Sequence, residues 1–379
     1  MRQIKIQNFG PIGNVDVQFG DLTILVGPQA SGKSVSLEVL KLIADRDHII
    51  NTLDKYNYIW GHNVDNILNV YFGENMSKIW RENSYLELDD DIFPKTLLPK
   101  KANTEKDESI FYIPAQRILA MSDGRPRNFM EFDSTVPYVL RYFSETLRLF
   151  VQNGMGQSSQ IFPMKNRLKG FLRDSFDKSI FHNGKLVMED RGGQKKLLLK
   201  LDEMSVPFMA WSAGQKEFMP LLLAFYCLSG PPSKVVKKEK YKTVIIEEPE
   251  MGLHPQAIIS VIMQILELIQ TGYQVIISTH SPVFLDFAWA FNLLKDNQYK
   301  YEALNEIFHV KTTSSVANML DGIFDKTIKT FYFRRVKNQK VTSLDISSLD
   351  AGEYNNEISE WGGISGFSSH VSNVISKYL

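Results

Sequence analysis

The sequence predicts an α/β fold in which a mixed central sheet is flanked by helices. Three short runs, Leu22–Val26, Thr243–Ile246 and Tyr273–Ser278, are apolar along most of their length, as strands inside a parallel sheet are. A helical pattern follows the first run from Ser34, and another covers residues 255–270, between the second and third runs. Strands that alternate with helices in this way favour parallel pairing.

Other regions add elements to this plan. Ile4 and Ile6 alternate with polar residues, which predicts a strand near the N-terminus, and Ile110–Ile113 has the composition of another short strand. Residues 131–180 show helical spacing. Residues 181–201 have the pattern of a hairpin, with a loop over 189–194 that contains Gly192.

Composition excludes several classes of protein. The 379 residues include 44% hydrophobic residues, which rules out wholesale disorder, and Cys227 has no second cysteine with which to form an internal disulfide. The longest apolar run, Leu221–Leu228, is far shorter than the roughly 20 residues that cross a bilayer. The N-terminal residues lack the apolar core of a signal peptide. We therefore expect a cytoplasmic protein that makes no membrane contact.

Charge gives only a weak indication of nucleic-acid binding. The 43 lysines and arginines balance the 43 acidic residues, so bulk electrostatics offers no argument for a polyanionic partner. A local basic run does occur, and it comprises Lys234, Lys237, Lys238, Lys240 and Lys242. Such a run is more often a solvated face than a phosphate track, so DNA stays an open partner that this pattern does not establish.

A phosphate-binding motif lies between the first buried strand and the helix that follows it. It fits the pattern G-x-x-x-x-G-K-[ST] and comprises Gly27, Pro28, Gln29, Ala30, Ser31, Gly32, Lys33 and Ser34. Its glycines let successive main-chain N–H groups face phosphate oxygens, and the helix dipole adds positive potential. In this motif the lysine reaches the β- and γ-phosphates and the last hydroxyl ligates Mg²⁺. The predicted ligands are therefore a nucleoside triphosphate and Mg²⁺.

Three further motifs follow in the chain. Residues 211–215, with the sequence WSAGQ, open a helix. The second buried strand ends in Glu247 and Glu248, within the phrase IEEPEMGLHP, and the third ends in STHSP, which contains His280. Carboxylates at a strand end near a phosphate loop supply a metal ligand and a base, and a histidine there can contact the γ-phosphate.

Together these motifs resemble the ABC-type ATPases, and within them the branch that contains SMC proteins, RecF and the ATPase half of OLD nucleases. The phrases IEEPEMGLHP and STHSP resemble OLD-like and RecF-like proteins more than transporter subunits. The resemblance covers roughly residues 1–45, 110–117 and 205–290. It implies a P-loop NTPase fold of the ABC/SMC-like type, with a helical insertion, and ATP hydrolysis that requires Mg²⁺.

The resemblance also implies roles for single residues. Glu247 becomes the carboxylate on the Mg²⁺ side, although Asp is commoner there, and Glu248 becomes the base that activates water. Lys33 and Ser34 hold the phosphates and the metal, and His280 becomes the switch histidine that faces the γ-phosphate.

Two loops complete the implied site. Ser212, Gly214 and Gln215 form the signature loop, which in this family touches the nucleotide of another subunit; Ala213 stands where Gly is usual. Gln116, which follows the strand at 110–113, is the candidate for the glutamine loop that touches the metal. ATP is therefore expected to hold a homodimer, or a higher homo-oligomer, together.

This reasoning divides the chain into a core, an insertion and an extension. Roughly 180 residues separate Lys33 from Ser212, which is more than in transporter subunits and leaves room for a compact insertion. We expect the extension either to complete the core or to bind a partner. The expected boundaries are residues 1–45, 110–120 and 205–300 for the ATPase core, 46–109 and 121–204 for an insertion with helical and hairpin parts, and 301–379 for the C-terminal extension.

The expected function is a switch whose ATP-dependent dimerisation controls DNA engagement or a separate effector protein, in antiphage defence or DNA maintenance. One alternative is the ATPase subunit of a membrane transporter. Another is an OLD-type protein whose nuclease lies on a different chain, because the sequence after His280 contains no D-x-D motif for a two-metal nuclease.

Overall fold

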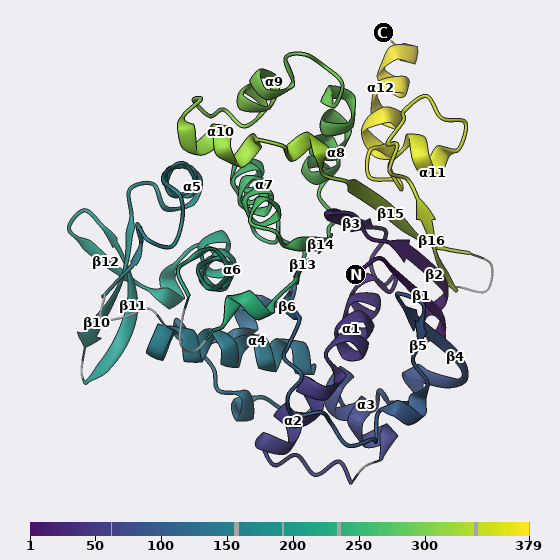
Figure 1. Ribbon diagram of the computed structural model, residues 1–379. Helices are drawn as coiled ribbons and strands as arrows, with labels where there is room; N and C mark the ends of the chain where they lie inside the picture. The colour runs from purple at the N-terminus through teal and green to yellow at the C-terminus, as the bar shows by residue number, and fades with distance from the viewer. Residues whose placement is uncertain (62, 155–158, 192, 233–235, 337–339, 379) are drawn as a thin grey trace.

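A ten-stranded sheet crosses the part of the protein that the computed structural model describes, which is residues 1–379 without 62, 155–158, 192, 233–235, 337–339 and 379 (Figure 1). Its strands in chain order are β1 (Gln3–Phe9), β2 (Ile12–Gln18), β3 (Leu22–Val26), β4 (Trp80–Leu88), β5 (Asp91–Ile92), β6 (Ile110–Ile113), β13 (Thr243–Glu247), β14 (Gln274–Ser278), β15 (Ile328–Arg335) and β16 (Val341–Asp345). In space the order is β5-β4-β1-β2-β16-β15-β3-β14-β13-β6.

The half of the sheet that carries the predicted motifs is parallel. Within the series β15-β3-β14-β13-β6, each strand is parallel to the next, so the carboxyl ends of these strands meet at one edge. Ile277 of β14 pairs with Ile24 on one side and Ile246 on the other. The predicted α/β class and the three predicted buried strands are confirmed, with shifts of one residue where β13 ends and β14 begins.

The other half of the sheet is mostly antiparallel, although β16 pairs in parallel with β2. Strand β1 pairs with β2 and β4, and β5 pairs with β4. Strands β4 and β5 come from residues 46–109, which sequence reasoning assigns to the insertion, and β15 and β16 come from residues 301–379. Both segments therefore contribute strands to the main sheet. Their backbone N–H and C=O groups are satisfied by pairing with β1, β2 and β3, which removes three strand edges from solvent.

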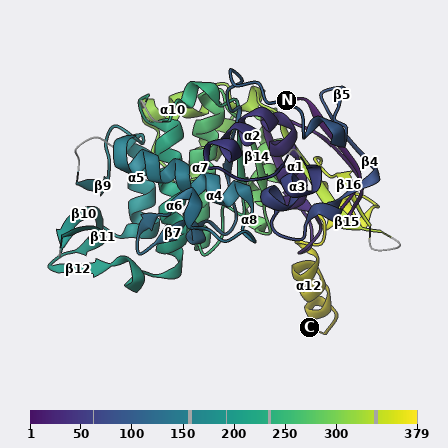
Figure 2. The same cartoon turned by 90° about the horizontal axis from the view of Figure 1, so that it is seen from below.

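Helices cover both faces of the sheet (Figure 1 and Figure 2). They are α1 (Lys33–Ala44), α2 (Arg46–Lys55), α3 (Val64–Phe72), α4 (Tyr138–Leu149), α5 (Gly170–Phe176), α6 (Ala213–Ser229), α7 (Pro255–Gln270), α8 (Pro282–Leu294), α9 (Lys300–Ile307), α10 (Ser314–Leu320), α11 (Asn356–Ser359) and α12 (Gly366–Tyr378). Along β13 the side chains alternate: Val244 and Ile246 join the core beneath α6–α8, and Ile245 joins the core beneath α1–α3. Among the described residues, no helix combines the length and hydropathy that a bilayer span requires.

Single helical turns extend or connect these elements. The π-helical turns η5 and η6 continue α4 and α5, and the others are 3₁₀ turns. They are η1 (Ser77–Ile79), η2 (Lys95–Leu97), η3 (Arg117–Ala120), η4 (Phe129–Glu131), η5 (Phe150–Gly154), η6 (Asp177–Phe181), η7 (Phe208–Ala210), η8 (Lys238–Lys240) and η9 (Ile323–Asp325).

A second, smaller sheet lies in a lobe on the side of the molecule opposite β4 and β5 (Figure 1). Its strands are β9 (Gln160–Phe162), β10 (Lys185–Arg191), β11 (Gln194–Leu201) and β12 (Met204–Pro207), and a hairpin of β7 (Met121–Ser122) and β8 (Arg125–Pro126) lies apart from it. The predicted hairpin is confirmed, but its loop is shorter than expected because pairing continues to Arg191 and Gln194. The predicted Gly192 lies outside the described residues. The helical expectation for 131–180 is wrong at β9, which extends to pair with β10.

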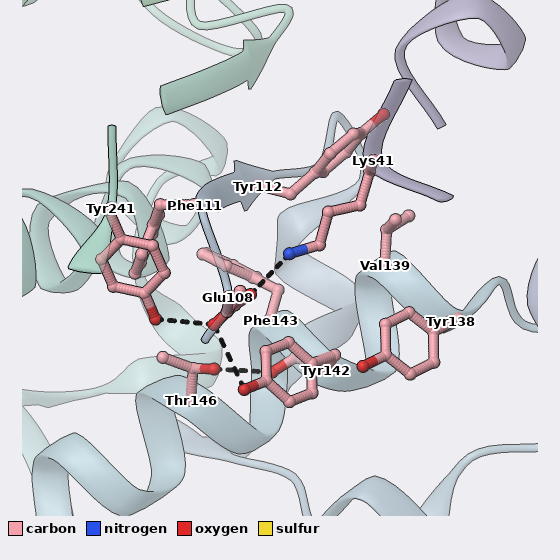
Figure 3. A pocket seen from close by; sticks show the side chains of 10 residues that line it. All are labelled: Lys41, Glu108, Phe111, Tyr112, Tyr138, Val139, Tyr142, Phe143, Thr146 and Tyr241. Carbon is pink, nitrogen blue, oxygen red and sulfur yellow. Dashed lines mark hydrogen bonds and ion pairs between the residues drawn. The ribbon is translucent and has the colours of Figure 1, made fainter. Parts of the chain in front are cut away.

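A buried ion cluster joins α1 to β6. Lys41 Nζ lies 2.8 Å from Asp45 Oδ2 and 2.5 Å from Glu108 Oε1, and it donates to the carbonyl of Ile110 at 2.7 Å. Figure 3 shows Lys41 and Glu108 pointing toward each other between β6 and α4, with the Tyr241 hydroxyl donating to Glu108. Burial by itself would raise the pKa of Glu108, but the surrounding cations lower it to about 2. The cluster therefore fixes the helix after the phosphate loop against a strand of the site.

We predict that His48, beside this cluster, makes stability depend on pH. Its Nε2 lies 2.8 Å from the Tyr142 hydroxyl, and burial lowers its pKa to about 4, against about 6.5 in an unfolded chain. The unfolded state therefore takes up the proton first, and stability that is complete above pH 6.5 is lost as the pH falls toward 4. Between pH 7 and 5, wild type should lose roughly 2 kcal/mol more free energy of unfolding than His48→Gln.

Urea unfolding at the two pH values measures this difference. His370, an exposed residue of α12, supplies the control, because His370→Gln should keep the wild-type dependence. Equal losses in wild type and His48→Gln would refute the assignment.

Candidate functional site

The phosphate loop connects the end of β3 to α1 and lies against β15. A Cβ on Gly27 would stand 2.4 Å from the carbonyl oxygen of Phe333, so only glycine permits this approach. Arg335, which ends β15, donates a hydrogen bond to the carbonyl of Ala30 at 2.8 Å, and Ala30 has a left-handed backbone with φ 55°. The loop is therefore supported by a strand that lies about 300 residues away in sequence.

Lys33 lies within the curl of this loop. Its Nζ donates to the carbonyls of Gly27 (2.7 Å) and Pro28 (3.2 Å) and lies 3.4 Å from Ser31 Oγ. Burial lowers the pKa of Lys33 to about 8, and the nearby glutamates act in the opposite direction. The ammonium group thus occupies a pocket made of carbonyl oxygens from its own loop, while Gln29 stands exposed at the rim.

His280 and Glu248 reach the lysine from the ends of β14 and β13. His280 Nε2 lies 3.3 Å from Lys33 Nζ and 3.6 Å from Glu248 Oε1. Burial and the adjacent Lys33 lower the pKa of His280, which favours a neutral ring that can accept a hydrogen bond from the lysine. Three of the residues proposed from sequence therefore form one chain of polar contacts: Lys33, His280 and Glu248.

Glu247 is buried, and its two carboxylate oxygens differ. Oε2 accepts a hydrogen bond from the Ala115 N–H at 3.2 Å, whereas Oε1 is buried and lacks a hydrogen-bond partner among the described residues. Burial raises the pKa of Glu247, and the neighbouring hydroxyls of Ser34 and Tyr112 partly oppose this rise. An unpartnered buried carboxylate oxygen beside the exposed Ser34 fits a divalent cation held jointly with phosphate oxygens.

Gln116 and its neighbour take different positions at the end of β6. Gln116 is exposed beside the Ala115–Glu247 contact. Arg117 is completely buried, and its guanidinium group donates to the carbonyls of Glu247 at 3.0 Å and Glu248 at 3.1 Å. Burial lowers the pKa of Arg117, while the glutamates around it raise it. The position next to the predicted glutamine thus carries a buried cation.

Glu250 anchors the loop that presents the histidine. Its Oε1 accepts hydrogen bonds from the His280 N–H at 2.7 Å and from the Thr279 hydroxyl at 2.8 Å. Sequence reasoning gave no definite role to Glu250. Its position two residues after Glu248, in a phrase that the family resemblance singles out, was the signal that could have found it.

The signature segment begins α6. The Ser212 hydroxyl accepts from the Gln215 N–H, and the Gln215 side chain accepts from the Ser212 N–H, which forms a capping box. A Cβ on Gly214 would stand 2.6 Å from the carbonyl oxygen of Gly252, so the start of α6 packs directly on the loop after Glu250. Among the described residues, Gly214 packs on Gly252, and the Gln215 side chain donates a hydrogen bond to the carbonyl of Ile180 at 3.2 Å. Ser212 is exposed to solvent.

The structure therefore brings some predicted residues together and not others. His280 contacts both Lys33 and Glu248, and Glu247 lies beside Ser34. Ser212 is exposed, and its recorded hydrogen bonds are with Gln215. Arg117 and Arg335 were missed. Arg117 directly follows the exposed Gln116, shortly after the end of β6, but a single arginine there carries no pattern that predicts which groups it binds.

Comparisons with known proteins found a matching family and a curated relative. The sequence profile of the family described as "AAA domain, putative AbiEii toxin, Type IV TA system" matches residues 52–286. The Old nuclease of Escherichia phage P2 is 45% identical over 82 residues, which are 22% of this chain and 14% of that nuclease. The match thus spans about a seventh of the curated relative.

Solved structures with similar folds include SMC head domains. An SMC head bound to the C-terminal winged-helix domain of ScpA has a TM-score of 0.42 at 12% identity, over 91% of this chain and 96% of that one. The SMC head domain from Thermotoga maritima has a TM-score of 0.38 at 13% identity, over 91% and 99% of the two chains.

We predict that Gly214→Ala destabilises the protein by about 1–3 kcal/mol, because the added methyl group meets the Gly252 main chain, which cannot move aside as a side chain would. Gly170→Ala is the matched control: its Cβ would meet nothing closer than Arg173 Nη2 at 3.7 Å, so its free energy of unfolding should stay within about 0.5 kcal/mol. Urea unfolding measures both. Equal stability of the two variants would show that the Gly214–Gly252 contact does not constrain α6.

Proposed function

Because this chain belongs to that AAA-domain family, and is an ATPase domain of the ABC/SMC type that resembles OLD proteins, we propose that it is an ATP-controlled switch. In this proposal it binds ATP with Mg²⁺, dimerises around the nucleotide and hydrolyses it. The dimer controls a separate effector in antiphage defence or DNA maintenance. The similarity to a phage nuclease supports that setting.

One observation carries the proposal. His280 contacts both Lys33 of the phosphate loop and Glu248 at the end of β13. The contacts of 3.3 Å and 3.6 Å bring together groups from three parallel strand ends. A loop of main-chain N–H groups with a lysine binds phosphates, and an adjacent carboxylate serves as a base. The combination suits transfer of a phosphoryl group to water.

Each residue has a distinct part in the proposed reaction. When ATP binds, Lys33 exchanges the carbonyls of Gly27 and Pro28 for phosphate oxygens, and His280 turns from the lysine toward the γ-phosphate. The Glu248 carboxylate then orients a water molecule in line with the scissile bond and accepts its proton. Preorganised positive charge at Lys33 and at the start of α1 stabilises the charge that develops on the phosphoryl oxygens.

Ser34 and Glu247 would hold Mg²⁺, with Gln116 as a further candidate ligand at the exposed rim. A bound Mg²⁺ supplies charge neutralisation between the β- and γ-phosphates. The buried Glu247 carboxylate is already fixed by the Ala115 N–H, so its free oxygen needs little rearrangement to act as a ligand.

The outward-facing start of α6 supports a second chain as the cap. Ser212 is exposed, and the helix begins with N–H groups that favour an anion. ATP held at Lys33 of one subunit would contact Ser212 and Gly214 of the partner. Loss of the γ-phosphate would then weaken the dimer, so the rate of hydrolysis would set the lifetime of the dimer.

A protein effector is favoured over direct DNA engagement. Lys240 lies 3.1 Å from the buried Glu108, and Lys238 donates to the carbonyl of Gly230, so two members of the predicted basic run serve internal contacts. Lys234 lies outside the described residues. Lys238 and Lys240 therefore contribute less positive charge to any contact with the phosphate backbone of DNA.

We predict that Glu248→Gln binds ATP but hydrolyses it at least about 100-fold more slowly, because the base is lost while the phosphate contacts remain. It should accumulate as an ATP-bound dimer. Lys33→Ala should fail to bind ATP. Sedimentation velocity with and without ATP measures the dimer, and phosphate release measures hydrolysis.

Glu203→Gln provides a surface control for the loss of one carboxylate, since it lies in an exposed turn. An unchanged sedimentation profile of Glu248→Gln on addition of ATP would contradict self-dimerisation. A second chain of different sequence would then be the capping partner to seek.

A further inference from the structure

Arg117 is a fully buried cation whose recorded hydrogen bonds all go to main-chain carbonyls. Its Nη1 donates to Glu247 at 3.0 Å, and its Nη2 to Glu248 at 3.1 Å and to Pro249 at 3.4 Å. Its Nε donates to the carbonyl of Glu217 in the first turns of α6, at 3.3 Å. Longer contacts of 3.4 Å return to Pro114 and Ala115. One planar group therefore joins the end of β6, α6 and residues 247–252 at the end of β13, which we call the carboxylate loop.

The carboxylate loop requires such support because its backbone is unusual. The backbone of Glu248 has φ 42°, in the left-handed region that residues other than glycine and asparagine rarely adopt. Its N–H donates to the carbonyl of Ser278 at 2.8 Å, and its carbonyl accepts from Arg117. Both main-chain groups of the proposed base are thus held, one by the strand that presents His280 and one by the arginine.

At its other end, the linkage through Arg117 reaches α6, the helix that begins with the signature loop. Arg117 contacts Glu217, which lies three residues after Gly214, and Gly214 packs against the carbonyl of Gly252. The start of α6 therefore touches the carboxylate loop at two points, through the guanidinium group and through the Gly214–Gly252 approach. Movement of α6 would act on the backbone of Glu248 through both.

We propose that Arg117 is a positioning residue that transmits capping of a partner's nucleotide, at the start of α6, to the base Glu248 of its own subunit. When Ser212 and Gly214 engage ATP on the other chain, α6 is fixed, and Arg117 fixes the left-handed backbone of Glu248 in turn. Each chain would then hydrolyse its nucleotide only when it also caps a neighbour. This inference rests on the proposed function, and it adds the route by which the two sites of a dimer communicate.

The chemistry of the side chain favours arginine for this role. Its planar fork presents five N–H donors in fixed directions, and here they reach carbonyls on three segments. Lysine would keep the charge but has three donors at a single nitrogen, so it cannot span the same carbonyls. Arg117→Lys therefore separates the geometry of the fork from the presence of positive charge.

The first test compares Arg117→Lys with Arg141→Lys. Arg141 is also completely buried, but it contacts Tyr58 and Val70, away from the carboxylate loop, so its replacement controls for the general cost of altering a buried arginine. Arg117→Lys should bind ATP within about threefold of wild type, while kcat falls about 100-fold through misplacement of the base. Arg141→Lys should keep the wild-type kcat.

Two results would overturn the proposal. One is a kcat for Arg117→Lys that falls no further than that of Arg141→Lys. The other is loss of ATP binding in Arg117→Lys, which would make the residue part of the binding site itself. If wild type hydrolyses no ATP, the proposed function fails, and the second test still decides the role of Arg117.

The second test is native-state hydrogen exchange on wild type without nucleotide, which does not depend on a variant that folds. If Arg117 ties the two segments, the amide of Glu248, bonded to Ser278, and the amide of Lys216, bonded to Ser212, should open with the same free energy and the same dependence on denaturant. Separate opening of the two amides would show that the segments are not linked and would refute the coupling.

Discussion

The site depends on the parallel pairing of β3, β14, β13 and β6. Parallel strands place their carboxyl ends at one edge of the sheet, and each of these ends continues directly into a residue of the site. Lys33, His280 and Glu248 are separated by long stretches of sequence, yet they meet within hydrogen-bond or ion-pair distance because their strands are neighbours. The buried Lys41–Glu108 pair reinforces this arrangement by fixing α1 against β6.

Close main-chain approaches and buried charges then make the edge rigid. Gly27 lies against Phe333 and Gly214 against Gly252, at distances that exclude any side chain. Arg117 and Glu250 bind main-chain groups of the loops that carry Glu248 and His280. These contacts hold the chemistry in place before a nucleotide arrives, and they connect the site to α6. The same contacts reach the start of α6, where Ser212 is exposed, and this is the position at which the proposed second chain would act.

Much of this arrangement could be predicted from the sequence, for a physical reason. Buried parallel strands are apolar on both faces, so Thr243–Ile246 and Tyr273–Ser278 were visible as runs, and the polar residues after them were natural site candidates. The position of β15 beside β3 could not be predicted, because the apolar pattern of a strand does not identify its neighbours. Arg117 was missed for a related reason: its acceptors are carbonyls, which every residue possesses, so no side-chain pattern marks them.

The central claim is that one chain completes the nucleotide site of another, and complementation between two variants tests it most directly. Lys33→Ala removes the phosphate contact, and Ser212→Arg blocks the cap with a bulky cation. If the cap comes from the partner, each variant alone should sediment as a monomer with ATP, and an equal mixture should form an ATP-dependent heterodimer, because a Lys33→Ala chain can cap ATP held by a Ser212→Arg chain. A mixture that stays monomeric with ATP, as its components do, would contradict the account.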